Sequence, residues 1–190
     1  SPDAVYFVPQ LGIPTNCPLI HLDQLIVRYC SPEWQELLRA QNTRMEFGKG
    51  EAIFTTGQHA ERMFMVHRGR VKVVAHYPGG RQRIIRLAGE GEVLGHRGIG
   101  NEPTYTASAI ALTPTTVNVI PMGLFLSTLR ANNLFCYHFL LFFAEEMRVL
   151  DQQMRDLMEM EVAQRVAKVL LLCRSTFGMD PERPTVLAYT

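Results

Sequence analysis

Glycines divide the stretch from Lys49 to Ala111 into short apolar segments, and this pattern restricts the possible folds more than any other feature. The segments contain β-branched and aromatic side chains, which favours β-strands joined by tight turns. Gly79 and Gly80 lie between two such segments, and paired glycines reach the positive φ angles that a hairpin turn needs. The expected strands cover residues 52–54, 63–66, 71–74 and 84–87. We therefore expect a compact all-β barrel or sandwich in this part of the chain.

The composition fits a globular protein. Of the 190 residues, 47% are hydrophobic, and the formal net charge is +1. The sequence has no run of about 18 apolar residues, so we expect no membrane span. Its first residues lack the basic-then-apolar pattern of a secretory signal, which predicts a cytoplasmic protein. A net charge near zero gives no general attraction to nucleic acid, so the chain by itself is not expected to bind DNA.

The order of the glycines resembles that of the cyclic nucleotide-binding domain, a β-roll with a jelly-roll-like topology. The match runs without a gap over residues 49–95 and includes a characteristic Gly-x6-[Phe/Tyr]-x4-Gly spacing, formed by Gly57, Phe64 and Gly69. Over residues 47–178 the chain resembles the sensor half of a Crp/Fnr-type bacterial transcription regulator. Its Gly-His-Arg-Gly segment resembles the variant common in Bacteroidetes. The resemblance implies an α+β fold, in which a β-roll is flanked by helices and followed by a long dimerisation helix.

Residues 1–46 are expected to form an N-terminal arm and two short helices, ahead of a β-roll at 47–121. Apolar residues recur every three or four positions between His21 and Gln41, with Ser31 and Pro32 as a typical start for the second helix. The end of the roll, residues 111–121, is interpreted as its last strand pair.

Residues 122–160 are expected to form the dimerisation region, with a break at Asn132-Asn133 before a helix of about 134–160. Apolar residues on this helix alternate by three and four, as in two helices that supercoil around each other. We therefore expect a homodimer, although the same residues could instead cover an intramolecular bundle. A second stripe, Phe139, Phe142 and Val149, is expected to face the roll. The predicted dimer seam is Leu140, Phe143, Met147, Leu150, Met154 and Leu157.

Residues 161–190 are interpreted as a C-terminal helix and a linker. The helix is expected at 162–177, with Gly178 ending it. Its predicted apolar face consists of Val166, Val169, Leu170 and Cys173. In the family that the chain resembles, a winged helix-turn-helix follows this point. The sequence stops at Thr190, so we expect the chain as given to lack the recognition helix and to reach DNA only through a C-terminal domain that it does not contain.

Metal sites and catalytic motifs are not evident. The cysteines are Cys17, Cys30, Cys136 and Cys173, and none forms a C-x-x-C pair, so reduced thiols are expected. No G-x-S-x-G elbow or paired-carboxylate setting occurs. A cupin-like metal barrel would need His-x-His on one strand, which the histidines of the β region lack. These are His59, His67, His76 and His96. We expect neither a metal nor an enzymatic activity.

The resemblance implies that residues 91–95 belong to a phosphate-binding cassette, where backbone N–H groups and a short helix approach an anion. Relatives that bind cyclic nucleotides have an acidic residue and an arginine where this chain has His96 and Tyr105. Both changes disfavour cAMP, and Arg97 could turn inward as a substitute clamp for another small anionic effector. No cofactor is assigned. The candidate ligand-binding residues are Gly91, Glu92, Val93, Leu94, Gly95, His96, Arg97, Tyr105, Thr106 and Ala107.

The function expected from these patterns is effector sensing and dimerisation within a Crp/Fnr-type transcription regulator. Two alternatives remain open. The chain could be a stand-alone cAMP-binding module, or it could be a ligand-free scaffold that keeps only the dimer.

Overall fold

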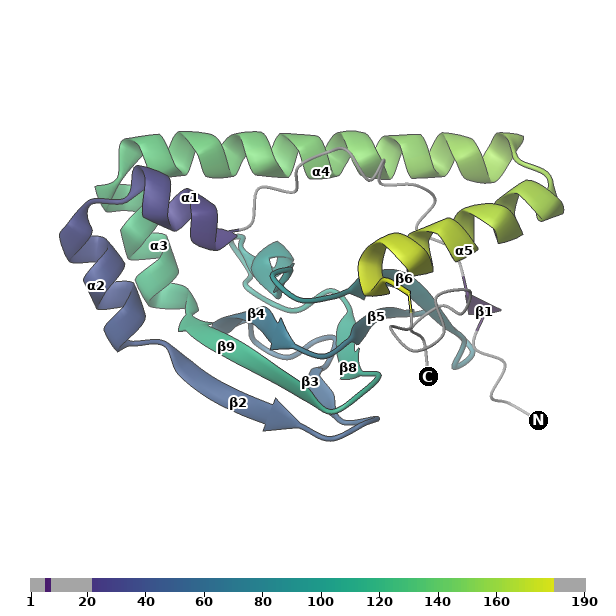
Figure 1. Cartoon of the computed structure of the whole chain (residues 1–190), viewed down its shortest axis with the longest axis horizontal. Coiled ribbons are helices and arrows are strands. Elements are labelled where there is room, and N and C mark those ends of the chain that lie inside the picture. Colours follow the sequence, from purple (N-terminus) through teal and green to yellow (C-terminus); the bar gives the residue numbers. More distant parts are fainter. Residues whose placement is uncertain (1–5, 8–21, 180–190) are drawn as a thin grey trace.

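Two β-sheets form a roll, and a long helix runs across its top (Figure 1). The computed structural model of the protein describes residues 6–7 and 22–179. The side chain of Leu157 is outside this description, so the predicted place of Leu157 in a dimer seam is untested. Most of the predicted N-terminal arm and of the C-terminal linker also lies outside the described residues.

The strands follow the glycine-bounded segments of the sequence. One sheet has the order β1-β6-β5-β8-β3 and the other the order β2-β9-β4-β7. Within the described residues the pairings are antiparallel, except that β1 runs parallel to β6. The strands are β1 Tyr6–Phe7, β2 Thr43–Phe47, β3 Ala52–Phe54, β4 Arg62–Arg68, β5 Val71–His76, β6 Gln82–Ala88, β7 Val93–Leu94, β8 Ser108–Ala111 and β9 Thr115–Pro121.

Three of the glycines explain why the glycine pattern predicts the strands. Gly79 and Gly80 have φ angles of 81° and 75° in the turn that joins β5 to β6, as the hairpin prediction requires. Gly69 has φ 108°, and a Cβ atom there would lie 2.6 Å from Thr115 Oγ1 and 2.7 Å from the carbonyl oxygen of Pro114. Only glycine fits such a position, since both the backbone angle and the space exclude a side chain.

Two details of the predicted roll differ from the structure. Residues 111–121 were interpreted as a strand pair, but β8 and β9 belong to different sheets, so the chain crosses between the sheets at 112–114. The roll also begins earlier than residue 47, because β2 pairs with β9 over residues 43–47. Both differences arise because strand pairing depends on how the whole roll closes. The alternation of apolar and polar residues within one segment does not encode that.

The helices lie close to their expected positions. They are α1 Leu22–Tyr29, α2 Pro32–Ala40, α3 Met122–Ala131, α4 Asn133–Glu159 and α5 Val162–Phe177. The predicted break falls between α3 and α4 at Asn132, which is buried. Its Oδ1 accepts from the backbone N–H of Ser31 at 3.0 Å, and its Nδ2 donates to the carbonyl of Thr128 at 2.9 Å. Asn132 therefore ties the start of α2 to the corner between α3 and α4.

The inner face of α4 packs on the roll through aromatic side chains. Phe135 and Phe139 are buried, and Phe142 is half-buried against the same core. Phe143, predicted to lie in the dimer seam, also turns inward, with its ring centroid 5.0 Å from that of Phe139. Phe143 therefore contributes to the core of the single chain, and its predicted place in a dimer seam remains a prediction. An apolar residue near the boundary between two helix faces can pack on the side of either face. Here Phe143 packs into the core.

The outer face of α4 exposes several large apolar side chains. Leu140, Met147 and Met154 recur every seven residues and are each more than 60% exposed, and Leu150 is 37% exposed. We call the first three residues the outer stripe. Val149, predicted to face the roll, is half-buried.

Helix α5 folds back against β6, where Val169, Leu172 and Cys173 pack over Val74 and Leu87. Of the predicted apolar face of this helix, Val169 and Cys173 pack against the sheet, whereas Val166 and Leu170 are exposed. An ion pair between Lys168 and Asp156 joins α5 to the end of α4.

Candidate effector pocket

Two closely packed glycines shape the cassette segment. Strand β7 leads into Gly95, which has φ 79°, and then into a short 3-10 helix, His96–Gly98. A Cβ atom at Gly95 would lie 3.1 Å from the carbonyl oxygen of Arg62, and one at Gly98 would lie 2.4 Å from the Cβ of Ala60. Because the segment is pressed against the roll at both glycines, the side chains between them have little choice of position.

A small cavity opens next to this segment. Its volume is about 50 Å³, whereas sites for small organic ligands usually measure about 300–1,000 Å³. The pocket is thus closed in this conformation. Arg86 from β6 contributes to its wall, together with Phe54, Val73, Ile85 and Gly98. Of the predicted ligand-binding residues, those lining the cavity are Leu94, Gly95, His96, Arg97, Thr106 and Ala107.

The other predicted ligand-binding residues are placed elsewhere. Gly91, Glu92 and Val93 do not line the cavity. Tyr105 is buried in the core, where its ring stacks on Phe54 with centroids 4.2 Å apart and its hydroxyl donates to the carbonyl of Arg62 at 2.7 Å. Burial raises the pKa of this hydroxyl. Tyr105 therefore supports the cassette from behind and does not face a ligand in this conformation.

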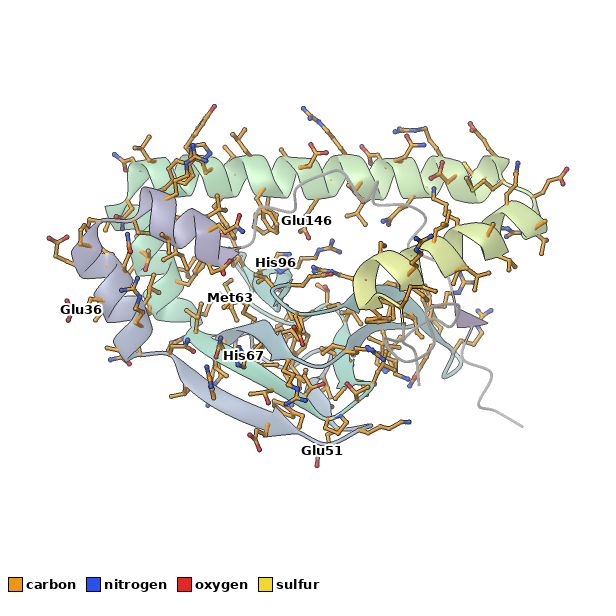
Figure 2. The ribbon with its side chains drawn as sticks, viewed as in Figure 1. Glu36, Glu51, Met63, His67, His96 and Glu146 are labelled. Carbon is orange, nitrogen blue, oxygen red and sulfur yellow. The ribbon has the colours of Figure 1, made fainter. Side chains whose placement is uncertain are left out.

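The carboxylate of Glu146, on α4, points at the cassette (Figure 2). Its Oε2 lies 2.8 Å from Nε2 of His96 and 3.5 Å from Nε of Arg97, and its Oε1 lies 3.8 Å from the guanidinium of Arg86. Arg97 thus turns toward the pocket, as the sequence left open, although its side chain remains 35% exposed. One acidic group from a distant helix accordingly lies among three basic ones.

Arg86 is held in place by further partners. Its guanidinium forms an ion pair with Glu92 at 2.9 Å and donates to the carbonyl oxygen of Val93 at 3.0 Å. Its side chain is only 9% exposed. A buried arginine with several fixed acceptors is a preorganised site for a carboxylate or a phosphate.

Glu146 is ionised at neutral pH. Burial raises the pKa of its carboxyl, but the hydrogen bond from His96 and the positive charges around it outweigh burial and lower the pKa to about 2. Burial lowers the pKa of His96, against the opposing effect of Glu146. A neutral imidazole has one N–H, and a carboxylate can only accept, so Nε2 of His96 is the nitrogen that donates. Its Nδ1 is buried and has no hydrogen-bond partner among the described residues.

Sequence reasoning missed both Arg86 and Glu146. Arg86 was treated as part of an apolar strand, although an arginine between buried residues of one strand needs an internal partner. Glu146 follows Phe142 by four positions and Phe143 by three, so helical spacing places it on the same face as these two aromatic residues. This spacing is the sequence signal that predicts an inward-facing Glu146.

A larger groove, of about 1020 Å³, lies at the other end of the roll beside Arg68, Arg70 and Phe177. Residues 180–190, which follow Phe177 closely in the sequence, lie outside the described residues, so we assign this groove no ligand.

The described residues offer no group of three His, Cys, Asp or Glu side chains that could hold a metal ion. Cys30, Cys136 and Cys173 are free thiols, and burial raises the pKa of Cys30 to about 11. Cys17 lies outside the described residues. In the part of the chain that the structure covers, no helix combines the length and apolarity needed to cross a membrane.

Known proteins resemble this chain in sequence and in fold. The family model of the cyclic nucleotide-binding domain matches residues 44–132. The cyclic AMP receptor protein of Thermus thermophilus is 29% identical over 78% of this chain and 69% of its own length. A CRP-like cAMP-activated global transcriptional regulator of Mycobacterium tuberculosis is 25% identical over 74% of this chain and 63% of its own length. The sensor domain of the transcriptional regulator DNR from Pseudomonas aeruginosa superposes with a TM-score of 0.59 at 23% identity, over 76% of this chain and 92% of that domain.

The chain therefore contains a cyclic nucleotide-binding domain, with homologues in the Crp/Fnr family of transcription regulators. This confirms the fold class and the resemblance predicted from the glycine pattern. The matched segments span 69% and 63% of the Thermus and Mycobacterium proteins, so both relatives extend beyond the part that this chain matches.

Proposed function

We propose that the chain is the effector-sensing and dimerisation module of a Crp/Fnr-type transcription regulator. The observation that supports this best is the position of α4 between two surfaces. Its inner face brings Glu146 against His96 and Arg97, which line the pocket, while its outer face exposes the outer stripe. A rigid helix that carries both features can transmit a change in the pocket to a partner molecule.

Dimerisation is proposed through the outer stripe. Its three residues are separated by seven positions, which is the spacing of a coiled-coil seam. Exposed apolar rows of this kind mark association surfaces in soluble proteins. A second copy of α4 is the partner that fits, because it would present the same row of side chains along the same length.

Contact with DNA is proposed to come from a segment outside this chain. The two relatives named above extend beyond the matched part, and the Mycobacterium protein is called a transcriptional regulator. On the same basis we propose a cytoplasmic protein with no catalytic activity, whose effector is a small anion.

Two other functions can be compared with these observations. A stand-alone cAMP-binding module is supported by the names of the relatives, but a closed cavity of about 50 Å³, whose lining residues His96 and Arg97 already contact Glu146, disfavours it. A ligand-free dimeric scaffold is favoured by the same closed pocket. Anion binding by the purified chain separates this scaffold from the proposed sensor.

Sedimentation velocity tests the proposed dimer. The chain should sediment as a dimer at micromolar concentration, and Met147→Glu should convert it to a monomer, because like charges would then face each other across an apolar contact. Leu37→Glu is the matched control: this residue on α2 is also an exposed apolar one but lies outside the outer stripe, so its dimer should persist. A monomeric unmutated chain would refute the dimer.

A further inference from the structure

We propose that the Glu146 carboxylate occupies the anion subsite of the pocket, and that the effector is a compact carboxylate or phosphate anion that displaces it from Arg86, His96 and Arg97. This inference rests on the proposed sensing function and deepens it. It assigns the chemical class of the effector and the way in which its binding reaches α4.

The charge balance of the cluster supports an anion subsite. Arg86 and Arg97 are positive, Glu92 and Glu146 are negative, and His96 is neutral when only Nε2 carries a proton. The sum is zero while Glu146 is in place and becomes +1 when its carboxylate leaves. A positive charge that is largely buried needs a replacement anion. Opening of the pocket is therefore favoured when an anion enters in place of the Glu146 carboxylate.

His96 supplies a second, independent sign of a ligand. It lines the cavity and is 1% exposed, yet its Nδ1 has no hydrogen-bond partner among the described residues. An unpaired buried acceptor is unfavourable, so native structures rarely contain one without a reason. An effector with a hydroxyl group, or with a proton that His96 can take up, would satisfy this nitrogen.

The size of the cavity limits the anion. About 50 Å³ leaves room for little more than the terminal group of a ligand. Departure of the Glu146 carboxylate would free further space beside His96 and Arg97, so a single phosphate or a two-carbon dicarboxylate is a suitable occupant. A larger ligand would have to move α4 further away from the roll.

Displacement of the Glu146 carboxylate would loosen the contacts that hold α4 against the roll. Glu146 lies directly before Met147 of the outer stripe, and the neighbouring rings of Phe142 and Phe143 lie 5.7 Å and 5.6 Å from the imidazole of His96. These contacts hold the middle of α4 against the cassette. A ligand that replaces Glu146 loses none of its own contacts when α4 shifts, so it favours conformations in which the helix is released.

Titration calorimetry with inorganic phosphate and with oxalate tests the proposal on the purified chain. Glu146→Gln keeps the shape of the side chain but removes the competing charge, and should bind at least one of the two anions about tenfold more tightly than the unmutated chain. Glu145→Gln is the matched control, because it removes the neighbouring acid on the outer side of the helix, where Glu145 pairs with Arg148. Its affinity should equal that of the unmutated chain.

A second variant keeps the test decisive if Glu146→Gln does not fold. Arg97→Gln changes a partly exposed side chain, and should weaken anion binding about tenfold while the variant remains folded. Tighter phosphate binding would indicate a phosphate effector, and tighter oxalate binding a carboxylate effector. Equal affinities of the unmutated chain and Glu146→Gln, or no binding of either anion up to roughly 10 mM, would overturn the proposal.

Sedimentation separates this inference from the proposed function. A dimeric chain whose Glu146→Gln variant binds no anion would refute the displacement and leave the dimerisation module standing. A monomeric chain that binds anions as expected would refute the dimer and leave the subsite standing.

Discussion

Nε2 of His96 lies 2.8 Å from Oε2 of Glu146, although the two residues are 50 positions apart in the sequence. The hydrogen bond joins the cassette of the roll to the middle of the long helix. It is charge-assisted and almost fully shielded from water, so it contributes more than an exposed pair would.

Acidification should weaken the fold through Glu146. Its pKa is lowered from 4.5 to about 2: burial raises it, but the hydrogen bond from His96 and the nearby positive charges outweigh burial. A carboxyl whose pKa is lower in the folded state than in the unfolded state stabilises the fold at pH values above its unfolded pKa. About 3 kcal/mol is then lost as the pH falls from about 4.5 to about 2. His96 acts in the same direction near pH 6.5, because burial lowers its pKa and the unfolded chain takes up the proton first.

Urea denaturation of the unmutated chain and of Glu146→Gln isolates this contribution. The difference in the free energy of unfolding should be largest near neutral pH and should shrink below about pH 4.5. A difference that stays constant from about pH 7 to about pH 3 would show that Glu146 is not specifically stabilised in the folded state.

Gly98→Ala should destabilise the protein although its backbone is not left-handed. The new Cβ would lie 2.4 Å from the Cβ of Ala60, which is itself buried, so the cassette would have to shift. We expect a loss of about 1–3 kcal/mol in the free energy of unfolding. Gly100→Ala is the control, since nothing lies within 4 Å of its Cβ position. Equal thermal stabilities of the two variants would contradict the close packing.

Asn132→Ala should destabilise the corner between α3 and α4. The substitution leaves the Ser31 N–H without its acceptor and removes a donor to Thr128 in a buried setting. The expected loss is about 1–3 kcal/mol. Asn133→Ala changes the adjacent, exposed asparagine and should alter stability by less than about 0.5 kcal/mol. Chemical denaturation of the two variants side by side would measure the contrast.

Phe143→Ala should affect folding more than association. The ring packs inward against Phe139 and His96, so its removal should cost about 2 kcal/mol, less than for a fully buried phenylalanine. The dimer constant from sedimentation should remain close to that of the unmutated chain. A monomeric Phe143→Ala variant with unchanged stability would instead support the seam predicted from heptad spacing.

The roll could be predicted because its turns depend on local chemistry. Gly69, Gly79 and Gly80 occupy backbone conformations that other residues avoid, so their order in the sequence carries the order of the strands. The crossing from β8 to the other sheet could not be predicted this way. It depends on which strands meet when the roll closes, and neither alternation nor turn residues record that choice.

The pocket was harder to predict than the fold for a similar reason. The position of His96 and the backbone of the cassette follow from a continuous stretch of sequence. Its ionic partners come from β6 and α4, where Arg86 and Glu146 look like ordinary strand and helix residues. Tyr105 is the opposite case. Its position in the sequence predicted a ligand contact, but its ring is large and apolar enough to pack into the core.

Cyclic AMP should bind weakly, and arginine at position 105 should not improve the site. The closed cavity has room for little more than a compact anionic group, and Glu146 competes for the same basic residues, so we expect a dissociation constant no better than roughly 0.1 mM.

Tyr105→Arg would replace a buried ring and bring a charge into the core beside Phe54, so it should unfold the protein or sharply lower its stability. Tyr105→Phe is the control and should lose only the hydrogen bond to the Arg62 carbonyl, about 1 kcal/mol. Calorimetry giving low-micromolar affinity for cAMP, or a stable Tyr105→Arg variant that binds cAMP more tightly, would show that α4 and Tyr105 leave the pocket far more readily than their contacts imply.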